Sequence, residues 1–125
     1  MSGFAYLASP YSHDDEEVRI KRYMKVIEVA GSLMKAGEVI FCPIAHSCAI
    51  EHHGMAGQRM DGSFWKNQDV PILRHAEKLY VLMLPGWEVS KGIKWEIETA
   101  EMLNIPIVYL PNEILREIQE IEIRD

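Results

Sequence analysis

The chain has 125 residues, a formal net charge of −6, 48% hydrophobic residues and 26% charged residues. This composition is that of one globular domain, neither disordered nor fibrous, and the acidic balance disfavours a nucleic-acid polymer or an anionic membrane surface as a partner. With two cysteines, Cys42 and Cys48, and no visible signal peptide or membrane span, we expect a cytoplasmic protein.

The first half of the chain predicts a strand, a helix and a second strand. Residues 4–8 form a short apolar strand, and the turn at 9–12 leads into a helix that we expect to end before Gly37. Ser12 opens a capping-box-like pattern at the start of this helix. Residues 39–42 then form the second strand.

The segment 43–62 has no sustained periodicity, so we expect a long loop with one irregular helical turn around Ala49. With Cys42 before it, this part of the chain contains five side chains of zinc-binding types, namely Cys42, His46, Cys48, His52 and His53. Their spacing matches no common structural zinc site. We therefore favour a polar loop that faces a substrate, and we expect no metal.

The second half predicts helix, strand, helix and strand. We expect a helix over 63–75, with Ser63 as its N-cap and Pro71 bending or splitting it. Residues 79–84 and 105–110 are continuous apolar runs, as in strands that are buried on both faces. Between them, Ser90 can cap another helix, and a last helix is expected near the C-terminus.

This alternation predicts a single α/β domain over residues 1–125. We expect a three-layer α/β/α sandwich around a doubly wound, mostly parallel sheet of four or five strands, flavodoxin-like or Rossmann-like, with the strands at 4–8 and 79–84 adjacent at its centre. Its mouth would be built from 9–13, 43–62, the region of Asp69 and 85–92. No Gly-x-Gly-x-x-Gly follows the first strand, so no dinucleotide cofactor is expected.

Glu96 is the most informative residue of the helix after Ser90. The apolar stripe of this helix comprises Ile93, Ile97, Ala100 and Leu103. At 100° per residue Glu96 projects inside the arc of this stripe, where a carboxylate is costly unless it is paired or used. Its place early in the helix also puts it near the carboxyl edge of the sheet. A half-exposed glutamate at the edge of the stripe is the alternative interpretation.

Three pieces of sequence together resemble the nucleoside 2-deoxyribosyltransferase superfamily. They are Tyr6-Leu-Ala-Ser-Pro10, Asp69 ahead of the central strand, and Ser90-x-Gly92-x-x-x-Glu96-x-x-x-Ala100. Through the stretch from Pro85 to Gly92, the chain looks similar to small, often phage-associated members of this superfamily. The resemblance covers most of the chain in order.

The resemblance implies N-glycosidic chemistry at a deoxyribose. Glu96 matches the family's nucleophile, which attacks C1′ and forms a glycosyl-enzyme ester that water or a second base resolves. Asp69 matches an acid that orients or protonates the base, and Tyr6 matches a tyrosine that hydrogen-bonds the nucleophile. Without the family, Asp69 is equally well a helix-surface carboxylate, and Tyr6 is better explained as a core aromatic.

Ser90 distinguishes two activities of the superfamily. Transferases that act on free nucleosides commonly have an acid six residues before the nucleophile, whereas the nucleoside-monophosphate hydrolases have a serine that contacts the 5′-phosphate. A serine hydroxyl and free amides at a helix N-terminus attract a phosphate. We therefore favour an N-glycosidase of (2′-deoxy)nucleoside 5′-monophosphates; a base-exchanging transferase and a non-catalytic nucleotide-binding module are the alternatives, and Ser90 as a simple N-cap remains open.

The other substrate-binding candidates surround this predicted mouth. They are Ser9, Ser12 and His13 for the phosphate, Gly92 beside Ser90, His46 in the segment 43–62, and Trp65, Trp87 and Tyr11 for stacking on the base. The resemblance also implies a homodimer or larger assembly. The apolar excess of the last helix, at Ile121 and Ile123, is compatible with that.

Overall fold

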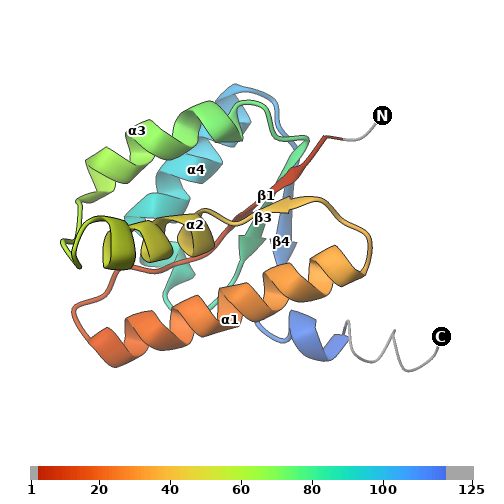
Figure 1. Cartoon of the computed structure of the whole chain (residues 1–125). Coiled ribbons are helices and arrows are strands. Elements are labelled where there is room, and N and C mark those ends of the chain that lie inside the picture. The colour runs from red at the N-terminus through yellow and green to blue at the C-terminus, as the bar shows by residue number, and fades with distance from the viewer. Residues whose placement is uncertain (1–2, 118–125) are drawn as a thin grey trace.

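A computed structural model describes residues 3–117 of the chain, which contain one sheet of four strands (Figure 1). The strands are β1 (Ala5–Ala8), β2 (Ile40–Phe41), β3 (Lys78–Leu82) and β4 (Ile107–Leu110). They lie in the order β2-β1-β3-β4, and every neighbouring pair is parallel. The predicted parallel sheet and the central pairing of β1 with β3 are therefore confirmed.

Helices connect the strands and cover both faces of the sheet (Figure 1). They are α1 (Glu16–Lys35), α2 (Pro43–Ala49), the π-helix η1 (Ile50–Gly54), α3 (Gly62–Leu73), the short 3₁₀ helix η2 (Trp87–Val89) and α4 (Lys91–Met102). The long helix α1 lies along one face, and α3 and α4 lie along the other. This is the predicted three-layer, Rossmann-like sandwich.

Alternate residues of the central strands point to opposite faces of the sheet and divide the core in two. On one face, Ala5 and Leu7 belong to a cluster with Val26 of α1. On the other, Tyr6 belongs to a cluster with Ile93 of α4. The Tyr6 side chain is therefore on the side of the sheet that α3 and α4 cover.

The segment 43–62 is not the long loop that its sequence predicts. α2 begins with Pro43 at its first position, where the missing N–H would have no helical partner, and Ile44 packs against the core on the α1 face. α2 continues directly into η1, so residues 43–54 are helical. A π-helix bonds residue i to i+5, which breaks the 3.6-residue periodicity that sequence analysis relies on.

Two helix starts also differ from the prediction. Asp15, and not Ser12, caps α1, and its carboxylate accepts a hydrogen bond from a first-turn N–H at 2.9 Å. Asp61, and not Ser63, caps α3 in the same way at 2.8 Å. Aspartate is as good an N-cap as serine, so the sequence alone did not separate these candidates. Pro71 does not split α3, because it lies inside the last turn of that helix.

The predicted last helix begins at Ile114 and is described as far as Glu117. Ile114 and Leu115 pack against the core on the α1 face. Ile121 and Ile123, on which the predicted oligomer partly depends, lie outside the described residues. Within residues 3–117, none of the helices has the length and apolar character needed to span a membrane.

Candidate active site

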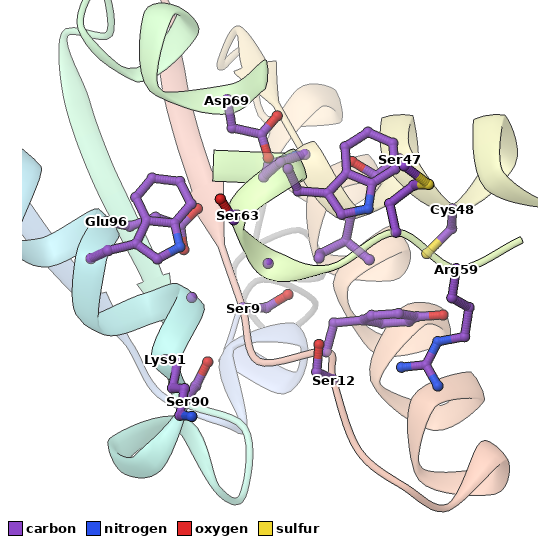
Figure 2. Close-up of a pocket in the computed structure, with 18 of the residues that line it drawn as sticks. Ser9, Ser12, Ser47, Cys48, Arg59, Ser63, Asp69, Ser90, Lys91 and Glu96 are labelled. Atoms are coloured by element: carbon purple, nitrogen blue, oxygen red, sulfur yellow. The ribbon is translucent and has the colours of Figure 1, made fainter. Parts of the chain in front are cut away.

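A cavity of about 590 Å³ opens at the carboxyl edge of the sheet (Figure 2). Its walls come from the segments that follow β1, β2 and β3 and from α3 and α4. The chain winds from β1 to β2 in one direction and from β3 to β4 in the other, so the edge beside β1 and β3 is the switch point where doubly wound sheets bind ligands. The volume is typical of small-molecule sites.

Most of the predicted site residues line this cavity. They are Ser9, Ser12, Trp65, Asp69, Ser90, Gly92 and Glu96, together with Tyr11. Figure 2 shows Asp69 and Glu96 on one side of the cavity and Arg59 on the other. The fold thus brings together, at one edge of the sheet, residues that the sequence distributes over two loops and two helices.

Glu96 lies in the second turn of α4, on the helix face that packs against the sheet. Ser90 caps this helix as predicted, since its hydroxyl accepts a hydrogen bond from the N–H of Ile93 at 3.3 Å. Ile93 is buried in the core, and Glu96 beside it is only 6% exposed. Burial raises the pKa of Glu96 to about 8; the Tyr6 hydroxyl lowers this pKa, and the charge of Asp69 raises it.

Tyr6 and Asp69 complete a buried acidic group around Glu96. The Tyr6 side chain is 0% exposed, and burial, followed by the charges of Glu96 and Asp69, raises its pKa well above the ordinary value. Asp69 projects from α3 and is 5% exposed; burial raises its pKa to about 6, against the lowering effect of His46. Two buried carboxyl groups with raised pKa values beside one cavity are typical of functional sites.

Some polar atoms of this region lack a hydrogen-bond partner of ordinary geometry, although the Tyr6 hydroxyl lies close enough to Glu96 to lower the pKa of that carboxyl group. Among the described residues, three buried side-chain atoms have no hydrogen-bond partner, namely Tyr6 Oη, Ser9 Oγ and Asp69 Oδ1. Ser9 and Asp69 line the cavity, and Tyr6 lies directly behind Glu96. Because buried polar groups are nearly always bonded, this concentration marks the carboxyl end of β1 as a place where the fold keeps polar groups available to a bound molecule.

Comparison with known protein families identifies the family of this chain. The family described as a domain of unknown function, DUF1937, matches residues 3–111. The chain belongs to the DUF1937 family. The match includes every residue of the cavity wall, from Ser9 to Glu96. A comparison with curated proteins found none that matches the chain.

The opposite wall of the DUF1937 cavity comes largely from the segment 43–62, as predicted, but the contacts that build it were not predicted. Glu51, from η1, accepts two hydrogen bonds on one carboxylate oxygen, from the indole Nε1 of Trp65 at 2.8 Å and from the backbone N–H of Met60 at 2.9 Å. It therefore holds the Trp65 ring in place along the wall. Arg59 and Cys48 also line this side. The sequence placed the segment 43–62 at the mouth and named Cys48 only as a residue of a zinc-binding type, and it gave no role to Glu51 or Arg59.

Four predicted site residues do not line the DUF1937 cavity: Tyr6, which is buried beside Glu96, and His13, Trp87 and His46. His13 Nδ1 accepts a hydrogen bond from the N–H of Asp15 at 2.9 Å, so its ring helps to start α1. Trp87 packs on Tyr109, with ring centroids 5.7 Å apart. His46 is exposed, with its ring 5.7 Å from that of Phe41, and acts on the site only by lowering the pKa of Asp69.

Within residues 3–117 of this DUF1937 chain, no three His, Cys, Asp or Glu side chains come close enough together to hold a metal ion. Cys42 and Cys48 are free thiols. The described side chains that line the cavity offer carboxyl, hydroxyl, thiol, indole and cationic groups.

Proposed function

We propose that this chain is an N-glycosidase that cleaves the base–sugar bond of (2′-deoxy)nucleoside 5′-monophosphates. The observation that carries the proposal is the buried Glu96, which faces the cavity at the switch point of the sheet with Tyr6 and Asp69 beside it. Glycoside cleavage passes through an oxocarbenium-like transition state, which requires one carboxylate at the anomeric carbon and one proton donor for the leaving group.

The two carboxyl groups together supply this requirement between about pH 6 and about pH 8. With pKa values raised to about 6 for Asp69 and about 8 for Glu96, the pair holds one proton in this range. Because the pKa of Glu96 is the higher of the two, the proton lies mainly on Glu96; the reactive arrangement, with the proton on Asp69 and the negative charge on Glu96, is the minor one, at about one part in a hundred. The Tyr6 hydroxyl favours that arrangement because it lowers the pKa of Glu96.

The reaction then takes two steps. A Glu96 oxygen bonds to C1′ as the C1′–N bond breaks, and the proton of Asp69 passes to the nitrogen of the leaving base. Water next attacks C1′, Asp69 takes its proton, and the ester bond to Glu96 breaks. The products are the free base and the sugar 5-phosphate, and both carboxyl groups return to their starting state.

The groups suited to a 5′-phosphate lie at the start of α4. The backbone N–H groups of Lys91 and Gly92 are in the first turn, where the helix field favours an anion, and Lys91 has no partner among the described residues. Ser9 Oγ, buried and unpaired, lines the same cavity, as does Ser12. These groups support a nucleotide over a free nucleoside as the substrate.

The wall around Trp65 supports recognition of the base. The Trp65 indole is fixed by Glu51, and the Tyr11 ring also lines the cavity. Aromatic rings held in this way offer stacking surfaces, worth about 1–3 kcal/mol per base. A nucleotide with C1′ at Glu96 and its phosphate at Ser90 would direct its base away from the start of α4.

Release of free base tests this proposal directly. The protein is incubated with a panel of ribo- and deoxynucleoside monophosphates and the matching nucleosides, and free base is measured by chromatography. We expect base from at least one monophosphate, much less from its nucleoside, and none with Glu96→Gln. Transfer to an added acceptor base without need of a 5′-phosphate would indicate the base-exchanging transferase instead. Binding without release of base would indicate the non-catalytic module.

A further inference from the structure

Arg22 joins the two loops at the mouth of the cavity. From α1, its Nη1 donates a hydrogen bond to the carbonyl oxygen of Ser12 at 2.9 Å, and its Nη2 donates one to the carbonyl oxygen of Pro85 at 3.1 Å. Ser12 is in the loop after β1, and Pro85 is in the loop after β3. Because β1 and β3 are neighbours at the centre of the sheet, Arg22 spans the switch point where the cavity opens.

Gly86 shows how closely Arg22 is seated on the second loop. Gly86 has a φ of 93°, in the left-handed region that favours glycine. A Cβ at this position would lie 2.6 Å from Nη2 of Arg22. A side chain here would push the guanidinium away from Pro85, so the conformation of the loop and the position of Arg22 depend on each other.

The two joined loops carry the groups that we assign to the phosphate. Ser9 and Ser12 belong to the loop after β1, and the loop after β3 leads into Ser90 and Lys91 at the start of α4. Arg22 is not part of the cavity wall. Arg22 can therefore act on the substrate through the spacing of these loops without touching it; Arg22→Lys keeps the charge and separates this effect from simple attraction of the phosphate.

We propose that Arg22 is a positioning residue that clamps the loops after β1 and β3 at the separation that a nucleotide phosphate requires. This inference rests on the proposed function for its ligand. A guanidinium presents donors in a fixed planar fork, which suits two carbonyl groups at once, whereas a lysine ammonium offers a single point of attachment.

Arg19 provides a matched control on the same helix. Its Nη1 also donates hydrogen bonds to backbone carbonyls, those of His13 and Asp14. Both carbonyls belong to the loop after β1. Arg19 therefore bonds within one loop, whereas Arg22 bonds across two.

Hydrogen exchange tests the clamp without any reaction. In Arg22→Met we expect faster exchange of the amides in both loops, 9–15 and 83–90, with the central strands unchanged as an internal measure of folding. In Arg19→Met we expect faster exchange in 9–15 alone. Unchanged exchange of 83–90 in Arg22→Met would overturn the clamp.

Binding tests the role of the clamp toward the substrate. By calorimetry in a Glu96→Gln background, we expect Arg22→Met to weaken the binding of a nucleoside monophosphate about tenfold, as for one or two lost hydrogen bonds. The affinity for the matching nucleoside should be unchanged. Arg22→Lys should be intermediate and Arg19→Met neutral. In the active protein the loss should be in KM and not in kcat. Gly86→Ala should also weaken binding, because the φ of 93° strains any residue with a side chain and the added Cβ displaces Arg22.

The outcomes separate this inference from the proposed function. If wild type releases base but Arg22→Met keeps full affinity for the monophosphate, the inference is wrong and the function stands. If wild type releases no base, while Arg22→Met increases amide exchange in both loops and lowers the affinity for the monophosphate, the inference stands and the proposed function is wrong.

Discussion

Tyrosines on the two central strands each lie beside a glutamate. In one of the two clusters every polar group has a partner, whereas in the other some polar atoms have none. Tyr80 on β3 donates a hydrogen bond to Glu38, whose carboxylate also forms a salt bridge with Lys78 at 3.3 Å. Lys78 Nζ lies 4.9 Å from the centre of the Tyr80 ring. This cluster lies on the face of the sheet that α1 covers, and every member has a partner.

The cluster around Glu96, on the opposite face of the sheet, contains polar atoms that lack a partner of ordinary hydrogen-bond geometry. Tyr6 Oη and Asp69 Oδ1 are buried without hydrogen-bond partners, and burial raises the pKa values of Asp69 and Glu96. A cluster that serves the fold satisfies its polar groups, since each unpaired one costs about 1–3 kcal/mol. The contrast supports the proposed role of the Tyr6 cluster in binding or chemistry, and most of the predictions below compare one member of each cluster.

Substitutions of the two glutamates should differ most in their effect on the rate of base release. We expect Glu96→Gln to reduce base release by roughly a thousandfold or more, because an amide cannot act as the nucleophile. Glu38→Gln should leave the rate unchanged and lower only the thermal stability, since a partner of Tyr80 and Lys78 is weakened. Steady-state assays with unfolding curves measure both. Equal losses of rate in Glu96→Gln and Glu38→Gln would contradict a functional difference between the two clusters.

Asp69→Asn should reduce the rate by about a hundredfold, as expected for loss of a general acid. The wild-type rate should be highest between pH 6 and 8: below about 6 the pair gains a second proton, and above about 8 it loses its last one. In Asp69→Asn the alkaline decline should disappear while the acidic limb persists. A full alkaline decline in this variant would assign the proton to another group.

The tyrosines should separate activity from stability. Tyr6→Phe should reduce kcat by about tenfold and shift the alkaline limb to higher pH, because the hydroxyl that lowers the pKa of Glu96 is removed and the proton of the pair is held more tightly on Glu96. Tyr80→Phe should leave activity unchanged and destabilise the fold by about 1 kcal/mol, the value of a typical hydrogen bond. An inactive Tyr80→Phe that folds normally would contradict this assignment.

The smallest effect should be a pH-dependent difference in stability. Since the folded state raises the pKa of Glu96 from 4.5 to about 8, it holds a proton that the unfolded chain releases, and this stability is lost as the pH rises through that window. Glu96→Gln lacks this loss. Its Tm should match that of wild type near pH 4.5 and exceed it by a few degrees at pH 8. The Tm of Glu38→Gln should be lower than that of wild type but should change with pH in the same way.

The sequence predicted the part of the site that regular elements carry. The 3.6-residue period of α4 placed Glu96 on the buried face, and the ends of β1 and β3 placed Ser9 and Ser90 at one edge of the sheet. The roles of Tyr6 and Asp69 came from the family resemblance and remain proposals.

The features of the site that the sequence did not predict depend on contacts between residues far apart in the chain, which leave no periodic pattern in the local sequence. Glu51 bonds to Met60 and Trp65, nine and 14 residues away, from a π-helix whose geometry breaks the helical pattern. His13 was expected at the phosphate but is used to start α1, a choice that depends on the path of the loop. The link from Arg22 to Pro85 spans 63 residues and has no sequence signature.

The central claim is that Glu96 forms a covalent bond with the sugar, and the most direct test is to trap it. The protein is mixed briefly with a cleaved deoxynucleoside monophosphate, quenched in acid, and analysed by peptide mass spectrometry. We predict a deoxyribose-phosphate adduct on the peptide that contains Glu96, located at that residue, and none at Glu38 or in Glu96→Gln. Rapid release of base with no adduct at Glu96, or with the adduct on Asp69, would contradict this mechanism.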